Sequence, residues 1–234
     1  MQVRVFADKD KNFSEHRTDF DFIEHDYDQI AFTFHATASK LQRNHAYQTF
    51  FNNQIFAIMP IDHSKNTFTV VWSIPKDFAT EEYVRDNIDL LGQQLNTDIA
   101  ISGEILVFEL SSSRAKEYCI PGKCLIADSA HSFHPLAGQG LNLGIADIDV
   151  LVDEFKKAKS QGRSLGDIKV LKKYEVRRKI LNEAMLNGVN FLNHLFHSEN
   201  IYTKLFRNRG LRLVNKIPVI KNLLIKNAVG KIKI

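Results

Sequence analysis

The sequence predicts an α+β fold: an antiparallel sheet domain, then a strand-loop-helix segment, then a mainly helical C-terminal region. In the first half of the chain, apolar and polar residues alternate, which is typical of half-buried strands. From Leu141 onward, apolar residues instead follow a helical period. Between these halves, an apolar run ends at Ile126, Asp128 follows, and then comes a turn that contains proline and glycine.

The first half contains several predicted strands and one predicted helix. Alternation places Phe32 and Phe34 on one face of a strand, opposite polar neighbours. Thr80 is a good N-cap, and the helix that it starts carries one apolar stripe. The stripe consists of Val84, Ile88, Leu91 and Leu95, and the predicted strands cover residues 31–36, 55–60, 67–72 and 104–110.

Residues 124–151, which we call the fingerprint segment, have the residue order of an anion-binding turn. Asp128 follows a predicted buried strand, where α/β sheets place their ligands. Gly138 and Gly140 allow a ligand to approach the backbone closely. The free N–H groups of the helix predicted from Leu141 point toward this turn and favour negative charge.

The fingerprint segment resembles the second FAD fingerprint of the aromatic-ring flavoprotein hydroxylases. The matching positions are Ala127-Asp128-Ser129-Ala130-His131, Pro135, Gly138-Gln139-Gly140, Asn142, Gly144, Asp147 and Leu151. Ala127 and Ser129 depart from the family's Gly and Ala. The resemblance implies that Asp128 contacts the ribityl or pyrophosphate part of FAD and that residues 138–142 line the pyrimidine edge of the flavin. The cofactor-binding residues that it implies are Asp128, Pro135, Gly138, Gln139, Gly140, Leu141 and Asn142.

Other positions are similar to a narrower group, the ubiquinone-biosynthesis hydroxylases of the UbiH/VisC type. They are Ala57-Ile58-Met59-Pro60, Val70-Val71-Trp72, Tyr174, Arg177, Arg178, Asn190-Phe191-Leu192, Leu195-Phe196 and the tail from Arg207-Asn208-Arg209-Gly210-Leu211 through Pro218 and Lys221 to Ala228-Val229-Gly230. This resemblance implies an FAD-dependent monooxygenase that uses NAD(P)H and O2 to hydroxylate a polyprenyl phenol ring. Because the cofactor carries the difficult chemistry, we assign no catalytic acid or base.

The family's first FAD motif, a G-x-G-x-x-G that grips the ADP half, does not occur before residue 120. Ala7-Asp8-Lys9 with Ser14 and Arg17 resembles a degraded copy of the Asp-Gly motif that precedes the substrate domain in the family. Lys9 stands where the family has Gly, and we assign no binding role to Asp8. We therefore expect the C-terminal portion of a hydroxylase, which would need an N-terminal FAD-domain fragment as partner. The alternative is a catalytically inactive, membrane-associated binding subunit of a biosynthetic complex, or a truncated gene product.

The resemblance also predicts domain boundaries. Residues 1–18 are a remnant of the FAD-domain edge, and residues 19–113 form the substrate-binding sheet domain. Residues 114–200 form the C-terminal part of the FAD-binding domain, and residues 201–234 form a basic amphipathic tail.

Two other kinds of site are weaker interpretations of the fingerprint segment. Asp128, His131 and His134 have a metal-like spacing, but a proline and glycine turn follows them at once and no further ligand lies nearby in the sequence. Ser129 and Ser132 lie beside the histidines, but a hydrolase would need a G-x-S-x-G elbow, which the chain lacks. We therefore predict no metal.

Composition is that of an ordinary globular protein, with 44% hydrophobic and 25% charged residues. Cys119 and Cys124 are too few for a disulfide framework, so we expect two reduced, buried thiols in a cytoplasmic protein. The N-terminus has no apolar signal core, and no apolar run is long enough to span a bilayer.

The chain after Ile201 is unusually basic, with nine Lys and Arg residues and no acid. Since the whole chain carries +4 and these residues carry +9, residues 1–200 carry −5. A tail of this kind suits an anionic membrane surface, which would place the protein peripherally on the inner face of the membrane. A helix packed on its own domain is an equally good interpretation of Ile220, Leu223, Leu224 and Ala228. Nucleic acid is not predicted, because few aromatic residues interleave with the charges.

Overall fold

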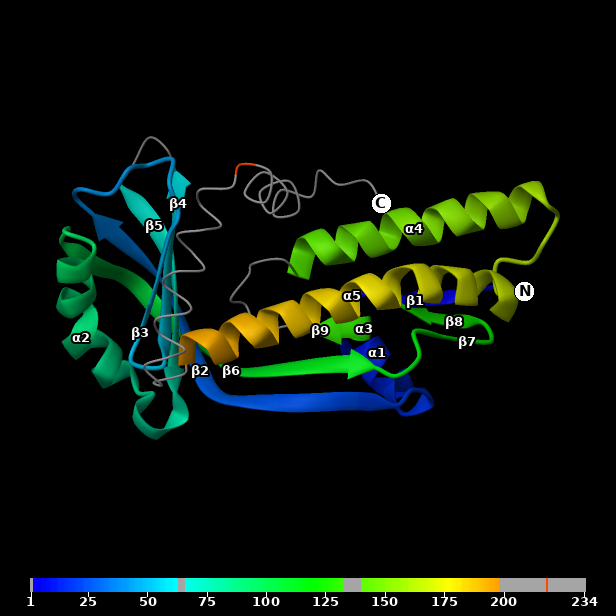
Figure 1. Ribbon diagram of the computed structural model, residues 1–234, viewed down its shortest axis with the longest axis horizontal. Helices are drawn as coiled ribbons and strands as arrows, with labels where there is room; N and C mark the ends of the chain where they lie inside the picture. The colour runs from blue at the N-terminus through cyan, green and yellow to red at the C-terminus, as the bar shows by residue number, and fades with distance from the viewer. Residues whose placement is uncertain (1, 63–65, 133–139, 198–217, 219–234) are drawn as a thin grey trace. The chain divides into compact units, whose positions relative to one another are not determined.

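The computed structural model describes residues 2–62, 66–132, 140–197 and 218, and the chain forms two compact units (Figure 1). Unit 1 contains residues 1–25 and 111–234, and unit 2 contains residues 26–110. Strands β2 (Phe22–Ala38) and β6 (Ile99–Ala115) each run through both units, so the chain passes between the units inside strands. Each unit has its own apolar core.

Unit 2 is built on five strands of a six-stranded sheet with the strand order β3-β4-β5-β2-β6-β9, in which β9 (His131–Ser132) belongs to unit 1. Its other strands are β3 (Tyr47–Phe51), β4 (Gln54–Asp62) and β5 (Thr67–Pro75). The register pairs Phe32 with Trp72 and Trp72 with Phe56, so large rings gather on one face. All four predicted strands are therefore confirmed, although β2 and β6 extend well beyond the predicted residues.

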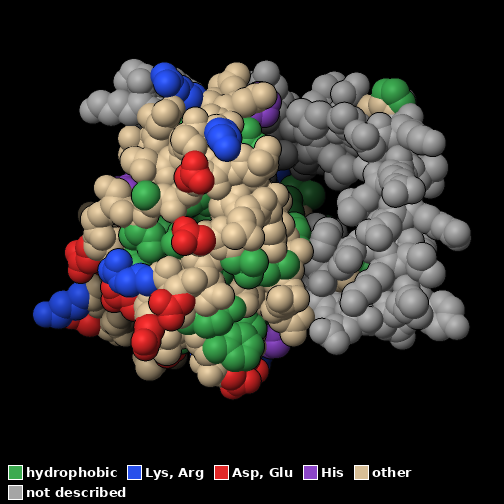
Figure 2. Space-filling model, turned by 90° about the vertical axis from the view of Figure 1, so that its left-hand side faces the viewer, with side chains coloured by type: hydrophobic (Ala, Val, Ile, Leu, Met, Phe, Trp, Pro, Cys, Tyr) green, Lys and Arg blue, Asp and Glu red, His purple; other side chains and the backbone are tan. Residues whose placement is uncertain are grey.

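Helix α2 (Glu81–Gln94) covers the aromatic face of this sheet, after a short 3-10 turn η2 (Lys76–Phe78). The Thr80 side chain accepts a hydrogen bond from the N–H of Tyr83, so the predicted N-cap is confirmed. Val84, Ile88 and Leu91 are buried as the stripe predicts. The face seen in Figure 2 shows charged side chains scattered among small apolar areas. Leu90 of α2 is an exposed apolar residue.

Unit 1 begins with β1 (Arg4–Phe6), α1 (Lys11–His16) and the turn η1 (Arg17–Asp19). A small sheet has the order β1-β8-β7, where β7 is Cys119–Ile120 and β8 is Lys123–Leu125. β1 and β8 are parallel, whereas β7 and β8 form a hairpin. Asp128 was expected directly at the end of a strand through Ile126. It lies instead in the single-turn helix α3 (Ala127–Ala130), followed by β9 (His131–Ser132), because β8 ends at Leu125.

Two long helices complete unit 1, α4 (Gly140–Ser160) and α5 (Ile168–His197). They pack on each other, and they confirm the helix predicted from Leu141 and the mainly helical region that follows it. The buried face of α4 is not the face that carries the exposed apolar stripe, however, and it mixes polar and apolar residues. It contains Gly144, Asp147, Leu151, Glu154 and Ala158, whereas Leu141, Ile145, Ile148 and Val152 are exposed. Polar contacts with α5 and α3 therefore decide how α4 is oriented.

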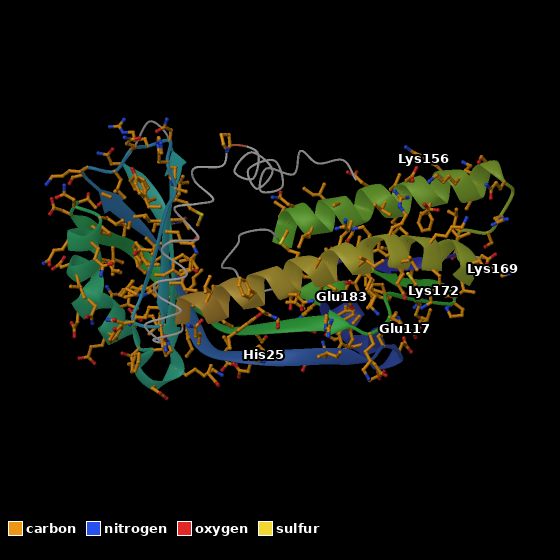
Figure 3. The ribbon with its side chains drawn as sticks, in the orientation of Figure 1. His25, Glu117, Lys156, Lys169, Lys172 and Glu183 are labelled. Carbon is orange, nitrogen blue, oxygen red and sulfur yellow. The ribbon has the colours of Figure 1, made fainter. Side chains whose placement is uncertain are left out.

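Side chains of α5 fasten the hairpin of unit 1. The Glu175 carboxylate accepts hydrogen bonds from the backbone N–H groups of Tyr118 and Cys119, both at 2.9 Å. Figure 3 shows Lys172 beside Glu117, with which it forms an ion pair of 2.8 Å. None of the described helices combines the length and the apolar composition required to span a bilayer. The predicted tail helix lies outside the described residues.

Candidate functional site

The fingerprint segment turns sharply after β8. Ala127, which replaces the family's Gly, has φ +49°, in the left-handed region that glycine adopts most easily. Its side chain faces α4, where a Cβ added to Gly144 would lie 2.8 Å from the Ala127 Cβ. Gly144 therefore serves close packing between α3 and α4, and its role in the motif is structural.

Ser129, the other departure from the family pattern, fastens α3 to β1. Its buried hydroxyl donates to the carbonyl oxygen of Phe6 at 2.6 Å and also lies 2.8 Å from the carbonyl oxygen of Ile126. The backbone N–H of Ser129 reaches the carbonyl of Ala7. These bonds hold the first turn of the fingerprint segment against the end of β1.

Asp128 is the exposed acid of this turn, and its carboxylate points toward the start of α4. A Cβ on Gly140 would lie 4.0 Å from Asp128 Oδ1, which is ordinary van der Waals contact. Three candidates, Gly140, Leu141 and Asn142, are the first residues of α4. Leu141 is 77% exposed and Asn142 is half-buried. Pro135, Gly138 and Gln139 lie outside the described residues.

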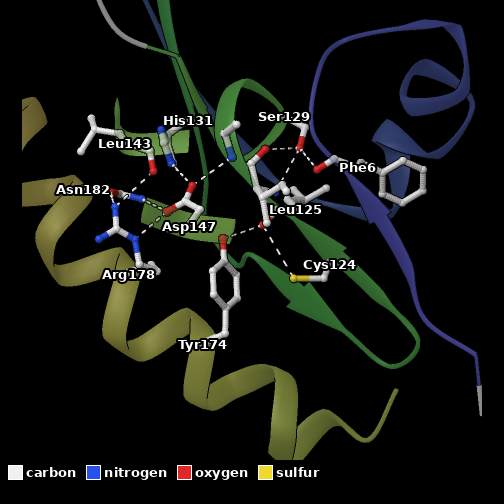
Figure 4. A network of polar contacts seen from close by, with 12 residues as sticks. Phe6, Cys124, Leu125, Ser129, His131, Leu143, Asp147, Tyr174, Arg178 and Asn182 are labelled. Carbon is white, nitrogen blue, oxygen red and sulfur yellow. Dashed lines mark hydrogen bonds and ion pairs between the residues drawn. The ribbon is translucent and has the colours of Figure 1, made fainter. Parts of the chain in front are cut away.

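The centre of the site is a buried carboxylate to which the sequence assigned no role. Asp147 of α4 is fully buried and accepts hydrogen bonds from His131 Nε2 and Arg178 Nε, both at 2.6 Å (Figure 4). It also accepts the backbone N–H of Ala127 at 2.9 Å and the Asn182 side-chain amide at 3.2 Å. One side chain thus joins α3, β9, α4 and α5, and we call these groups the Asp147 network.

The partners of Asp147 are themselves buried and bonded. Arg178 is 4% exposed and donates a further hydrogen bond to Asn182 Oδ1 at 2.9 Å. Burial alone raises the pKa of Asp147, but the hydrogen bonds from His131, Arg178 and the Ala127 backbone lower it below its ordinary value. The carboxylate is therefore ionised at neutral pH, and it holds the fingerprint backbone in place.

These contacts also show what the described histidine and serine of the two weaker interpretations bind to. No group of three or more metal-ligating residues occurs in the described part of the chain, and His134 lies outside it. His131 is directed at Asp147, and the Ser129 hydroxyl is directed at backbone carbonyls. Neither side chain is arranged for a nucleophile-base pair.

Cys119 and Cys124 face each other across β7 and β8 as free, buried thiols, as predicted. Burial raises the pKa of the Cys124 thiol well above its ordinary value. Since the thiolate is the reactive form, this cysteine is a packing residue.

Lys9 stands where the related motif has Gly, and it lies beside the fingerprint segment. Its ammonium donates to Ser132 Oγ at 3.2 Å. Burial and the nearby Arg17 lower the pKa of Lys9, while the charges of Glu24 and Asp128 act in the opposite direction. This departure therefore adds a cation close to Asp128.

Comparison with known proteins agrees with this geometry. The model of the FAD binding domain family matches residues 10–188, so the chain belongs to that family. It is 37% identical over 123 residues to the 3-demethoxyubiquinol 3-hydroxylase of Escherichia coli (strain K12), which is 53% of this chain and 32% of that protein. It is 26% identical over 237 residues to the ubiquinone hydroxylase UbiM of Neisseria meningitidis, which is 98% of this chain and 51% of that protein. The chain thus spans about half or less of the length of these relatives.

The fold has a close match among solved structures. The p-nitrophenol 4-monooxygenase PnpA of Pseudomonas putida DLL-E4 superimposes with a TM-score of 0.76 at 15% identity, covering 99% of this chain and 60% of PnpA. The antiparallel sheet domain, the fingerprint segment and the two long helices that follow therefore have the same fold as the matching part of that structure. The fold class and the family that the sequence predicted are confirmed.

The described residues fit the flavin end of FAD. Asp128 is exposed, Gly140 has no side chain that would fill the space beside the Asp128 carboxylate, and the first N–H groups of α4 favour negative charge. The backbone that carries these groups is fixed by the Asp147 network. An exposed carboxylate beside a helix N-terminus, on a backbone held by buried hydrogen bonds, is compatible with the flavin end of a large, anionic cofactor.

Proposed function

We propose that this chain is the flavin-binding and substrate-binding portion of an FAD-dependent monooxygenase that hydroxylates a polyprenyl phenol in ubiquinone biosynthesis. The observation that carries the proposal is the position of Asp128 beside Gly140 at the first turn of α4, on a backbone that buried contacts fix. The names of the relatives support the substrate class, because both are hydroxylases of ubiquinone or its precursors.

Each candidate residue has a limited part in this proposal. FAD, reduced by NAD(P)H, would supply the activation of O2 and the transfer of oxygen to the phenol ring. Asp128 would accept hydrogen bonds from the ribityl hydroxyls, and Gly140 would let the ring approach the backbone. The N–H groups at the start of α4 would stabilise negative charge on the pyrimidine edge. Pro135, Gly138, Gln139, Leu141 and Asn142 complete the proposed set.

The proposal includes an N-terminal fragment, because the G-x-G-x-x-G motif that grips the ADP half is not among these 234 residues. Membership of a biosynthetic complex and a peripheral place on an anionic membrane belong to the same proposal. Polyprenyl phenols live in lipid, so an enzyme that acts on them gains from a membrane-bound position. The basic residues after Ile201 are the part of the chain best suited to that contact.

The test measures FAD binding by this chain with and without an N-terminal fragment that carries the first FAD motif. We expect the chain alone to hold FAD weakly and to bind it stoichiometrically once an N-terminal fragment with the first FAD motif is added. The flavin absorption band after gel filtration reports the bound fraction. Tight binding by the chain alone would show that no second fragment is needed, and no binding in either sample would favour the inactive-subunit alternative.

A further inference from the structure

The outer face of α4 is an apolar stripe that nothing in the described structure covers. Leu141, Ile145, Ile148 and Val152 recur at helical spacing and are 77%, 49%, 46% and 42% exposed. Lys156, one turn further along, points away from α5 and ends the stripe (Figure 3). The opposite face of α4 is buried and polar at Asp147 and Glu154. Four large apolar side chains in a row on a solvent-facing helix are typical of a binding surface.

Unit 1 also presents an open strand edge at β1. Arg4 N–H donates to the carbonyl of Gly122, and the carbonyl of Phe6 accepts from Ile126, so these two residues face β8. Backbone groups of successive strand residues point to opposite edges, and those of Val5 therefore point away from β8. In the described strand order β1 is the edge, and Val5 is 40% exposed. Parallel pairs such as β1 and β8 normally lie inside larger, covered sheets.

We propose that the α4 stripe and the β1 edge form the docking surface for the part of the flavoprotein fold that these 234 residues do not include. A strand of that part would continue the sheet at Val5, and an apolar face of it would cover Ile145 and Ile148. Three observations support this occupant: the chain spans about half of its relatives, the parallel pair ends at β1, and the stripe follows directly from the proposed cofactor residues. This inference rests on the proposed function, and it identifies the surface of this chain that would bind the proposed partner.

The experiment mixes this chain with the half of Neisseria meningitidis UbiM that lies outside the matched 237 residues. Sedimentation velocity and titration calorimetry measure the complex. We expect a one-to-one complex that Ile145→Lys or Ile148→Lys weakens by about 10–100-fold, because an ammonium would be buried in an apolar contact. Leu90→Lys is the matched control, since Leu90 is a 47% exposed helical residue of unit 2 and should leave binding unchanged.

A second variant tests the strand edge. Val5→Pro removes an N–H that points away from β8, so it should weaken the complex while the pairing of Arg4 and Phe6 with β8 remains. Circular dichroism checks that each variant is folded. Equal affinity for wild type and both stripe variants overturns the docking surface, as does an absent complex. Self-association of the chain that the stripe variants abolish would assign the surface to a second copy and also overturns it.

Flavin absorption separates this inference from the function on which it rests. A complex that forms, depends on Ile145 and holds no FAD contradicts the proposed function and supports the docking surface. A complex that holds FAD, and whose affinity is unchanged by the substitutions at Ile145 and Val5, supports the proposed function and contradicts the docking surface.

Discussion

Ala127 and Gly144 pack closely against each other where α3 meets α4. A Cβ on Gly144 would lie 2.8 Å from the Cβ of Ala127, and Ala127 itself has φ +49°. The turn therefore carries an unfavourable backbone conformation at one residue and permits no side chain at the other. Ala127 directly precedes Asp128, so this packing helps to set the position of the carboxylate to which the proposed function assigns a contact with FAD.

This contact predicts a compensating pair of substitutions. Gly144→Ala should lower the free energy of unfolding by about 1–3 kcal/mol, because two Cβ atoms would overlap. Ala127→Gly alone should raise it by about 0.5–1 kcal/mol by relieving the left-handed conformation. The double variant should recover most of the loss, measured by urea unfolding. Additive effects in this cycle would mean that the two residues do not touch.

The Asp147 network predicts unequal roles for two adjacent arginines. Arg178→Met should destabilise the protein by about 3–5 kcal/mol, because it leaves the buried Asp147 carboxylate with too few donors. Arg177→Met is the matched control. Arg177 is 39% exposed, and Glu154 keeps Lys157 as a partner when Arg177 is removed, so the loss should be clearly smaller. Thermal unfolding of both variants compares them directly, and equal losses would contradict a dominant buried network.

The lowered pKa of Asp147 predicts a specific response to acid. A carboxyl group whose pKa is lower in the folded state stabilises the fold above its unfolded pKa of about 3.9, and this contribution is lost as pH falls through the folded value. The advantage of wild type over Asp147→Asn should therefore be constant at neutral pH and shrink below about pH 4. Unfolding midpoints of both proteins across this range measure it. A constant difference down to pH 2 would contradict ionisation of Asp147.

The proposed cofactor residues predict losses of flavin affinity without loss of the fold. Once the N-terminal fragment is present, Asp128→Ala should weaken FAD binding by about 1–3 kcal/mol, because a polar contact is removed. Gly140→Val should do at least as much damage by blocking the backbone approach, although the fold has room for a Cβ there. Fluorescence titration measures both. Unchanged affinity in both variants would remove this turn from the flavin site.

The tail predicts salt-sensitive binding to vesicles of anionic lipid. Each basic residue near such a surface contributes about 1 kcal/mol, so changing Lys216, Lys221 and Lys226 to Glu should abolish binding. Changing the same three residues to Gln should only weaken it. Co-sedimentation at low and high salt measures the bound fraction. If the Glu variant binds as well as wild type, the tail is an ordinary packed helix.

The sequence by itself determined the periodic elements and the family. Alternation predicted the strands of unit 2 because one face of each is buried, and Thr80 predicted the start of α2 because an N-cap is a local interaction. The spacing from Asp128 to Leu151 predicted the FAD family because many fixed positions must agree at once.

Only the tertiary structure decided which face of α4 is buried. Helical periodicity marks an apolar stripe but does not say what meets it, and here a buried ion pair between Asp147 and Arg178 turns the opposite face inward. In the sequence, the nearby Asp128 and His134 suggest a metal-ligand role for His131. In the structure His131 bonds to Asp147, which is 16 residues away and which only folding brings close. Short-range patterns such as alternation and N-caps can be recognised in the sequence, whereas contacts between residues far apart in the sequence depend on how the helices pack.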